Sequence, residues 1–110
     1  SAAGEPGRGT VGVVEVYPSS RNVAPSRVWF TVDFRHGDPD CLARMGEALT
    51  ARAAELAAAR KVTATVAPFW HSPLTPFDAA LVARCRDAAT ARGYRWRDIP
   101  TGIGHDAVYM

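Results

Sequence analysis

The last ten residues of the chain, Thr101–Met110, combine backbone freedom with side chains that can act on a substrate. Gly102 and Gly104 can adopt backbone angles closed to other residues, so a ligand can approach the main chain closely. Asp106 is placed to cap a helix that starts here, and the amides of a helix start favour anionic groups. His105, at this point, can donate a hydrogen bond to a developing oxyanion. The alternative is a plain strand-to-helix turn with His105 facing solvent.

Arg35 is the second candidate for chemistry. It ends an alternating segment on the polar side, close to Asp33. Its planar guanidinium can bind a substrate carboxylate through two parallel hydrogen bonds. Asn22, in the preceding long loop, can add an amide donor to the same anion. The alternative is an exposed arginine that pairs with Asp33 and contributes little to stability.

Other common catalytic patterns lack support. His36, His71 and His105 are about 35 residues apart, without a His-x-x-x-His or Cys-x-x-Cys pair, so a metal site built from these alone is not expected. No Gly-x-Ser-x-Gly elbow is present. Cys41 and Cys85 fall on the apolar side of predicted helices, as small buried residues of a protein in a reducing compartment.

Length and composition limit the class of protein. The 110 residues make one modest domain or parts of two, and 47% hydrophobic with 22% charged residues indicates a globular chain. A net charge of +2 and the absence of Lys/Arg runs argue against nucleic acid and membrane surfaces as partners. Without a secretory signal, or an apolar run near the roughly 18 residues that span a bilayer, we expect a cytoplasmic protein.

The first half of the chain predicts the order β-β-α-β. Val11–Tyr17 is rich in β-branched residues, and Val28–Arg35 alternates apolar and polar residues as a half-buried antiparallel strand does. Asp38 is a good N-cap for a helix with an apolar stripe that runs to about Arg60. Val62–Phe69 is the expected third strand, placed at an edge or strand end because it contains a proline.

The second half predicts α-β-loop-α. Residues 71–77 contain two prolines and break regular structure. Asp78 caps a helix over Ala79–Arg92 that Gly93 ends. A short strand, Tyr94–Ile99, leads into the glycine loop, and sites of α/β layers lie beyond the carboxyl ends of strands.

Several segments resemble the hydantoinase/carbamoylase group, which comprises N-carbamoyl-L-amino-acid hydrolases, allantoate amidohydrolases and ureidopropionases of the di-metal aminoacylase/carboxypeptidase-G-like metallopeptidase superfamily. The Gly-x-Gly-His-Asp-Ala motif is the most specific of them, and the resemblance covers about Val11 to Met110. The segments are Arg21–Val28, Phe30–Arg35, Ser72-Pro73, Pro76-Phe77-Asp78 and Gly102–Ala107.

The resemblance implies a fold class and a division of the chain. Residues 1–71 would belong to a lid domain that also forms the dimer, and residues 72–110 to the returning segment of the catalytic domain. The expected class is α/β (α+β): a partial ferredoxin-like lid, with an antiparallel sheet and a helix on one face, followed by an α-β-loop-α piece of the catalytic domain. The lid strand that neighbours Val62–Phe69 would lie outside this chain. We therefore expect a fragment of a longer protein, marginal in stability by itself.

The resemblance also implies a function. Asn22 and Arg35 would hold the substrate carboxylate, and His105 with the Gly104 backbone would stabilise the tetrahedral oxyanion. Two divalent metal ions, zinc or manganese, with ligands outside this chain, would supply the attacking hydroxide. The expected activity is cleavage of the carbamoyl C–N bond of N-carbamoyl-L-amino acids or related ureido acids by a full-length homodimer, with the fragment inactive alone.

Alternatives remain open. The chain could be a non-catalytic ferredoxin-like interaction or small-ligand-binding module in which Arg35 and His105 are incidental. An acylphosphatase-like fold also uses an Arg and an Asn, but its Arg loop should precede a helix near the N-terminus.

The shared role that the resemblance gives to Asn22 and Arg35 raises a question of distance. A strand over Val28–Arg35 extends roughly 26 Å. Asn22 and Arg35 can therefore share one carboxylate only if the loop folds back or if they act from different subunits.

Overall fold

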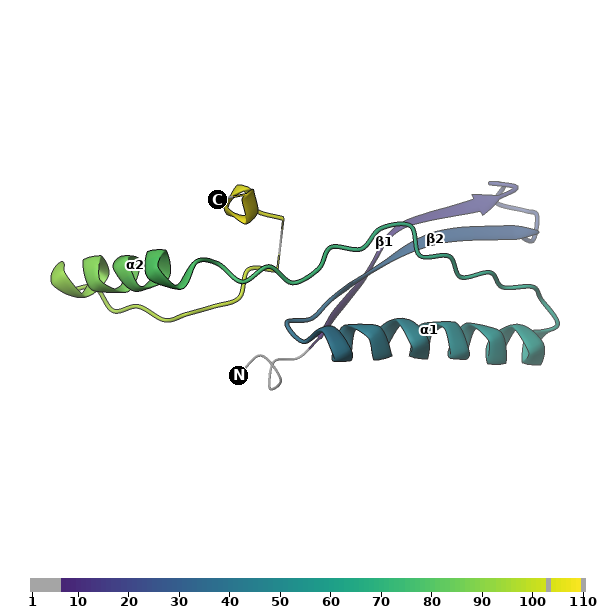
Figure 1. Cartoon of the computed structure of the whole chain (residues 1–110). Coiled ribbons are helices and arrows are strands. Elements are labelled where there is room, and N and C mark those ends of the chain that lie inside the picture. Colours follow the sequence, from purple (N-terminus) through teal and green to yellow (C-terminus); the bar gives the residue numbers. More distant parts are fainter. Residues whose placement is uncertain (1–6, 103, 110) are drawn as a thin grey trace.

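The computed structural model describes residues 7–102 and 104–109, so Ile103 of the glycine loop lies outside the described part. The strands form a two-stranded antiparallel sheet, and α1 packs against β2 (Figure 1). An α+β fold with an antiparallel sheet and helices is thus confirmed. The elements in chain order are β1 (Arg8–Tyr17), β2 (Arg27–Arg35), α1 (Pro39–Arg60), α2 (Ala79–Ala91) and the 3₁₀ helix η2 (Asp106–Tyr109).

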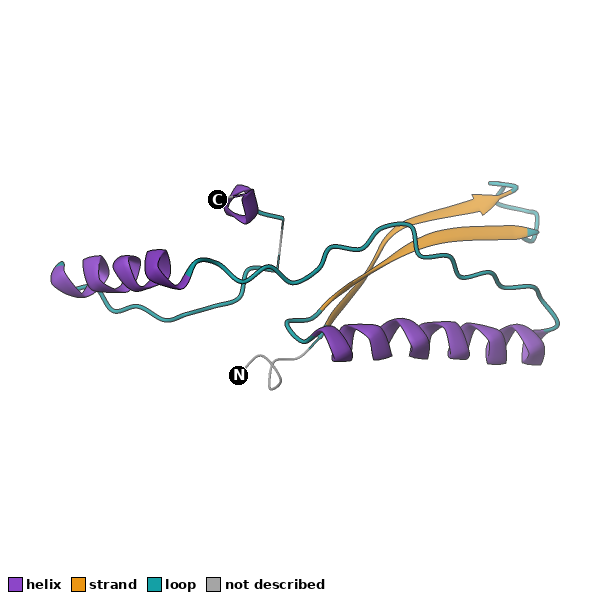
Figure 2. Ribbon diagram, in the orientation of Figure 1, coloured by secondary structure: helices purple, strands orange, loops and turns teal. Residues whose placement is uncertain are grey.

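The chain is elongated and its described residues enclose no core. The principal extents are 64 × 29 × 24 Å and the radius of gyration is 20.2 Å, against about 13 Å for a compact domain of this length. No described side chain is buried, and large apolar side chains are exposed on both strands. Figure 2 shows α2 at the opposite end from the sheet, joined to it by irregular segments. Apolar surface of this extent calls for further protein to cover it.

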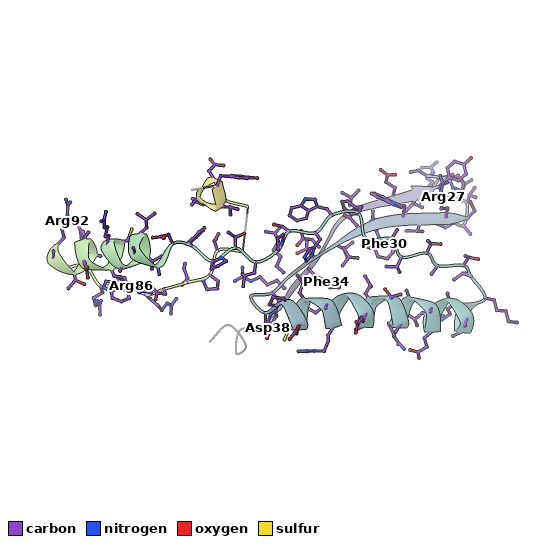
Figure 3. The ribbon with its side chains drawn as sticks, viewed as in Figure 1. Arg27, Phe30, Phe34, Asp38, Arg86 and Arg92 are labelled. Atoms are coloured by element: carbon purple, nitrogen blue, oxygen red, sulfur yellow. The ribbon has the colours of Figure 1, made fainter. Side chains whose placement is uncertain are left out.

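The apolar face of β2 lies toward α1. Val32 and Phe34 are half-buried, whereas Asp33 and Arg35 between and after them are exposed. Figure 3 shows Phe30 and Phe34 on the side of the sheet that faces the helix. The alternation predicted for this strand is therefore present, and it leaves the polar side chains on the other face.

The hairpin contains one irregularity of register. Arg8 pairs with Arg35 at the open end, and between Val11 and Val14 β1 carries one residue more than β2. The backbone N–H of Val13, inside this bulge, donates to the Thr31 hydroxyl at 3.2 Å. Because side chains alternate between the two faces, an extra residue reverses the alternation. Val11 and Val14 therefore share one face, and Arg8 shares the other with Arg35.

Helix α1 begins where the sequence predicts. The Asp38 carboxylate accepts hydrogen bonds from the backbone N–H groups of Asp40 (2.8 Å) and Cys41 (3.2 Å), and Pro39 is the first helical residue. These backbone donors, with Cys41 first, lower the pKa of Asp38. The helix ends at Arg60, and the capping residue Lys61 has a left-handed backbone with φ of 55°. α2 ends one residue earlier than predicted, at Ala91.

Replacing Lys61 by glycine is expected to stabilise the protein that contains this chain by about 1 kcal/mol, because glycine adopts the left-handed conformation without the Cβ clash. Gly93, with φ of 74°, already occupies the equivalent place after α2. Urea unfolding of the full-length protein measures the change. Ala54→Gly, inside the exposed face of α1, is the control and should lose about 1 kcal/mol. An unchanged or lower unfolding free energy for Lys61→Gly would contradict the expectation.

Two predicted strands do not form in the described chain. Segments 62–69 and 94–99 have no sheet hydrogen bonds, and the described sheet consists of β1 and β2. A strand exists only where a neighbour pairs with its N–H and C=O groups, and neither segment has such a neighbour here. The prediction of strands at Val62–Phe69 and Tyr94–Ile99 is wrong for this chain for that reason.

None of the helices in the described part of the chain has the length and apolar character that crossing a membrane requires.

Candidate functional site

Arg35 reaches the glycine loop. Its Nε donates to Oδ1 of Asp33 at 2.8 Å, and its Nη2 donates to Oδ2 of Asp33 at 3.1 Å. Its Nη1 donates to the carbonyl oxygen of Gly102, which is 67 positions further along the chain. Arg35 and the glycine loop were separate candidates in the sequence, and the structure brings them together.

The guanidinium of Arg35 keeps donors for a ligand. An arginine has five N–H groups, and the contacts with Asp33 and Gly102 use three, which leaves one on each Nη nitrogen. The Arg35 and Asp33 side chains are 47% and 46% exposed. The pairing with Asp33 that the sequence suggested is thus present, and it orients the arginine without using all of its donors.

The pair keeps its charges through neutral pH. The hydrogen bond from Arg35 is the main cause that lowers the pKa of Asp33, and the same bond raises the pKa of Arg35. Because the carboxyl pKa is lowered on folding, the pair is complete above the ordinary aspartate pKa and is lost as pH falls through the folded-state pKa. The ion pair therefore does not titrate where enzymes of neutral compartments work.

His105, and not Asp106, caps the short helix that follows. Nδ1 of His105 accepts a hydrogen bond from the backbone N–H of Ala107 at 3.0 Å, and its carbonyl accepts one from Val108 at 3.0 Å. Asp106 is the first residue of η2 and does not precede it. Its predicted N-cap role is wrong, because the backbone N–H of Ala107 donates to the His105 imidazole. With Nδ1 as acceptor, the neutral ring carries its proton on Nε2. Nε2–H is therefore the donor available to a ligand.

An aromatic contact orients the His105 ring. The rings of Phe77 and His105 meet edge to face, with centroids 6.3 Å apart and planes at 65°. Phe77 directly precedes Asp78, whose carboxylate accepts from the backbone N–H of Leu81 at 2.8 Å and caps α2. The start of α2 thus supports the histidine. Sequence reasoning gave Phe77 no role, although it stands in the Pro76-Phe77-Asp78 motif.

His105 lies within the reach of a small molecule from the Arg35 contact. Three peptide units separate Gly102 from His105, so their Cα atoms are at most about 11 Å apart. A Cβ added at Gly104 would meet no described atom within 4 Å, so the main chain there is open to approach. An anion held by Arg35 can thus place a neighbouring carbonyl group near the His105 donor.

Asn22 lies away from this cluster. It sits in the turn of the β1–β2 loop, where its Oδ1 accepts from the Ser20 hydroxyl at 2.7 Å. The loop closes at the strand ends, with the Ser26 N–H donating to the Tyr17 carbonyl at 2.8 Å. Arg35 is at the other end of the nine-residue strand β2, roughly 26 Å away along it. The loop does not fold back, so Asn22 and Arg35 of one chain are not brought together.

His36 has a local structural role. Nδ1 of His36 accepts from the backbone N–H of Asp38 at 2.9 Å, ahead of α1. Within residues 7–102 and 104–109, no three His, Cys, Asp or Glu side chains gather in a way that could hold a metal ion. Cys41 is half-buried and Cys85 is exposed, and both are free thiols. The expectation that Cys85 is buried is wrong for this chain, because its side chain borders an open groove that it shares with Trp96 and Ala107.

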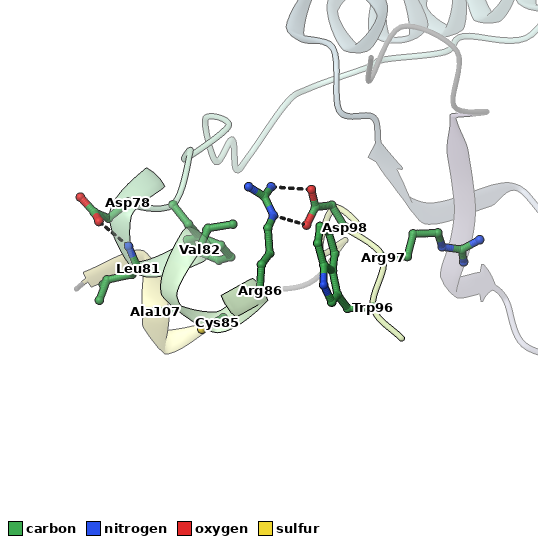
Figure 4. A pocket seen from close by; sticks show the side chains of 10 residues that line it. Asp78, Leu81, Val82, Cys85, Arg86, Trp96, Arg97, Asp98 and Ala107 are labelled. Carbon is green, nitrogen blue, oxygen red and sulfur yellow. Dashed lines mark hydrogen bonds and ion pairs between the residues drawn. The ribbon is translucent and has the colours of Figure 1, made fainter. Parts of the chain in front are cut away.

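Side-chain contacts hold segment 94–98 against α2 in place of a sheet (Figure 4). Nε of Arg86 donates to Oδ1 of Asp98 at 3.0 Å, and the guanidinium lies over the Trp96 ring, 5.5 Å from its centroid. Trp96 Nε1 donates to the Thr90 hydroxyl at 3.0 Å. Together with η2, these elements border an open, mainly apolar groove of about 380 Å³.

Comparisons with known proteins place this geometry in a family. No protein-family model matches the chain. N-carbamoyl-L-amino-acid amidohydrolase of Rhizobium meliloti is 36% identical over 101 residues, which cover 92% of this chain and 24% of that protein. Allantoate amidohydrolase of Bacillus subtilis is 27% identical over 98 residues, which cover 89% of this chain and 24% of that protein. The crystal structure of a hydantoinase/carbamoylase-family amidase from Burkholderia multivorans, 48% identical, matches 94% of this chain and 25% of its own with a TM-score of 0.82.

The chain is a segment of the hydantoinase/carbamoylase family. The resemblance found in its motifs is confirmed. The chain spans about a quarter of the length of the curated relatives it matches. The elements are arranged as in the matching quarter of the Burkholderia multivorans amidase, so the elongated layout of this chain also occurs within that longer protein.

Proposed function

We propose that the protein containing this chain is a metal-dependent amidohydrolase that cleaves the carbamoyl C–N bond of N-carbamoyl-L-amino acids or related ureido acids. The contact of Arg35 with Gly102 carries the proposal, because it joins a carboxylate anchor to the loop that holds an oxyanion donor. The names of the relatives support hydrolysis of these two kinds of substrate. A non-catalytic interaction module is not favoured.

In this proposal Arg35 binds the carboxylate that all of these substrates share. Its two remaining N–H groups, one on each Nη, can donate to the two oxygens of one carboxylate. Asp33 holds the guanidinium through Nε and Nη2 and so fixes its direction. Binding at this end of the substrate positions the carbamoyl group, and it does not distinguish between carbamoyl amino acids, allantoate and ureidopropionate.

His105 acts on the carbamoyl group. When hydroxide adds to the carbamoyl carbon, the electron pair of the C=O bond moves to oxygen, and negative charge develops there. The Nε2–H of His105 and the backbone of Gly104 donate to this oxygen and lower the barrier, since fixed donors need no reorganisation as the charge forms. The C–N bond then breaks, the amine takes a proton, and the carbamate released decomposes to ammonia and carbon dioxide.

The described residues of this chain do not fit a metal site, because no three potential ligands come together in them. We therefore assign the ligands of two divalent ions, zinc or manganese, to segments outside this chain, and expect the chain alone to be inactive. The proposed location is cytoplasmic, which agrees with the two free cysteines.

The position of Asn22 supports a dimeric site. We assign residues 1–71 to a lid that forms a homodimer, and residues 72–110 to the catalytic domain. In the described chain α2 packs against none of β1, β2 and α1, which supports the division. Asn22 and Arg35 lie at opposite ends of the hairpin, so we propose that Asn22 of one subunit and Arg35 of the other serve the same substrate carboxylate.

The proposal is tested with the full-length protein. Ammonia release is expected from at least one of an N-carbamoyl-L-amino acid, allantoate and 3-ureidopropionate. The carboxamide of the same carbamoyl amino acid, which lacks the carboxylate, is the matched control substrate and should be hydrolysed poorly. Chelation should abolish activity and added zinc or manganese should restore it. If the metal-loaded protein released no ammonia from any of the three substrates, the proposed function would be rejected. The alternative, a non-catalytic interaction module, would then be favoured.

A further inference from the structure

Arg8 stands directly opposite Arg35 in the hairpin. Cross-strand partners lie on the same face of a sheet, and like charges in that position destabilise the pair. The bulge between Val11 and Val14 produces this arrangement, because without the extra residue Arg8 would lie on the apolar face. The fold thus places two arginines side by side where stability alone would not favour it.

Both arginines converge on the glycine loop. Nη1 of Arg35 donates to the Gly102 carbonyl. Nη1 of Arg8 is 3.7 Å from the position that a Cβ on Gly102 would take. A side chain at residue 102 would therefore come against Arg8. The guanidinium groups of two neighbouring strands meet at one point of a segment more than 65 positions further along the chain.

Among the described residues, the charges at this point do not balance. Asp33 bonds to Arg35 through both of its carboxylate oxygens, so the charge of Arg35 is already opposed before a substrate arrives. Arg8 then supplies the net positive charge beside Gly102. One further carboxylate would neutralise the cluster, which fits a substrate with a single acid group at this end.

We propose that Arg8 is a second substrate-binding arginine, which attracts and holds the substrate carboxylate together with Arg35. The inference rests on the function proposed for the same site and adds a residue to it. Arg35 provides the oriented donors, and Arg8 provides the charge that draws the anion in. Since Arg8 acts on the bound acid group and not on the carbamoyl carbon, its effect belongs to substrate binding and not to the chemical step.

The test compares Arg8→Gln, Arg8→Lys and a matched control in the full-length enzyme. The control is Arg52→Gln, an exposed arginine on α1 that pairs with Glu55 at 2.7 Å. We expect Arg8→Gln to raise KM for an N-carbamoyl-L-amino acid by about 5- to 10-fold and to change kcat by less than about 2-fold. Salt should raise KM less in Arg8→Gln than in the wild type. Arg8→Lys should retain most of the affinity, and Arg52→Gln should match the wild type.

Thermal unfolding separates binding from a structural role. Because Arg8→Gln removes a like-charge pair, it is expected to leave the melting temperature unchanged or higher. Wild-type KM and wild-type salt dependence in Arg8→Gln would overturn the inference while leaving the proposed function intact. A lower melting temperature with a matching loss of kcat would also overturn it, in favour of a role in the hairpin.

Direct binding keeps the two proposals distinguishable. Calorimetry with L-methionine, which has the carboxylate but no carbamoyl group, reports the anchor without turnover. If the wild type binds L-methionine more tightly than Arg8→Gln but hydrolyses no carbamoyl substrate, the inference stands and the proposed function fails. Equal binding by both proteins would overturn the inference.

Discussion

Replacing His105 by alanine in the full-length enzyme is expected to lower kcat by about 10²- to 10³-fold, with KM changed far less. The physical reason is the fixed Nε2–H donor. Nδ1 accepts from the Ala107 N–H at 3.0 Å, so the neutral ring carries its proton at Nε2. From there it can donate to the carbamoyl oxygen on which negative charge develops. Steady-state kinetics with an N-carbamoyl-L-amino acid measures both parameters.

Two further variants separate chemistry from folding at this position. His105→Asn keeps a side-chain acceptor for the Ala107 N–H, because asparagine is a good N-cap, but it removes the imidazole donor. It should fold as the wild type does and lose kcat almost as fully as alanine. His105→Gln carries an amide donor on a longer side chain and should recover part of the rate. A His105→Asn enzyme with wild-type kcat would show that the imidazole only caps η2.

Replacing Arg35 by alanine is expected to raise KM by about 10- to 100-fold, with a smaller effect on kcat, because a carboxylate loses a pair of charge-assisted hydrogen bonds. Arg35→Lys keeps the positive charge but not the pair of parallel hydrogen bonds to the carboxylate. Its affinity for substrate should therefore lie between those of Arg35→Ala and the wild type. Arg52→Ala, which also removes an exposed arginine from an ion pair, is the control. If Arg35→Ala chiefly lowered kcat and His105→Ala chiefly raised KM, the two roles would be exchanged.

The contribution of Arg35 should not vary with pH between about 5 and 9. Its own pKa is raised and that of Asp33 is lowered, in each case mainly by their shared hydrogen bond, so both stay charged in this range. The ratio of KM between Arg35→Ala and the wild type is therefore expected to be flat there.

Mixing two variants with weakened substrate binding, assayed at a substrate concentration below their KM, tests whether Arg35 acts with Asn22 across a dimer. If the two residues come from different subunits, a dimer of one Arg35→Ala and one Asn22→Ala subunit has one doubly impaired site and one intact site. Random exchange should then restore about a quarter of wild-type activity. No recovery on mixing would mean that both residues act in one subunit. That result would contradict the proposal, which rests on the positions of Asn22 and Arg35 at opposite ends of β2.

The sequence was a good guide where local interactions decide the structure. Asp38 and Asp78 mark the starts of α1 and α2, and both carboxylates accept backbone N–H bonds in the first turn. The alternation over residues 28–35 correctly separated the apolar face of β2 from the face that carries Arg35. Caps and alternation depend on residues a few positions apart, so the chain itself contains the information.

Strand formation and residue contacts depended on partners that local patterns do not specify. The segment 62–69, rich in β-branched residues, has strand character, but no strand pairs with it in the described part of the chain. The motif after Thr101 indicated that Asp106 caps the helix, whereas the structure shows the backbone N–H of Ala107 donating to Nδ1 of His105. Asn22 and Arg35 were matched to one anion by type, and only the closed loop shows that one chain keeps them apart.

The sequence by itself determined the helices, the hairpin strands and which side chains have chemistry suited to an acid substrate. Only the tertiary structure decided which of them meet: Arg35 with Gly102, Arg8 beside both, and Phe77 against His105. The reason is that one extra residue in β1 changes the face on which Arg8 lies, and contacts across more than 65 positions follow from how segments pack and not from how they alternate.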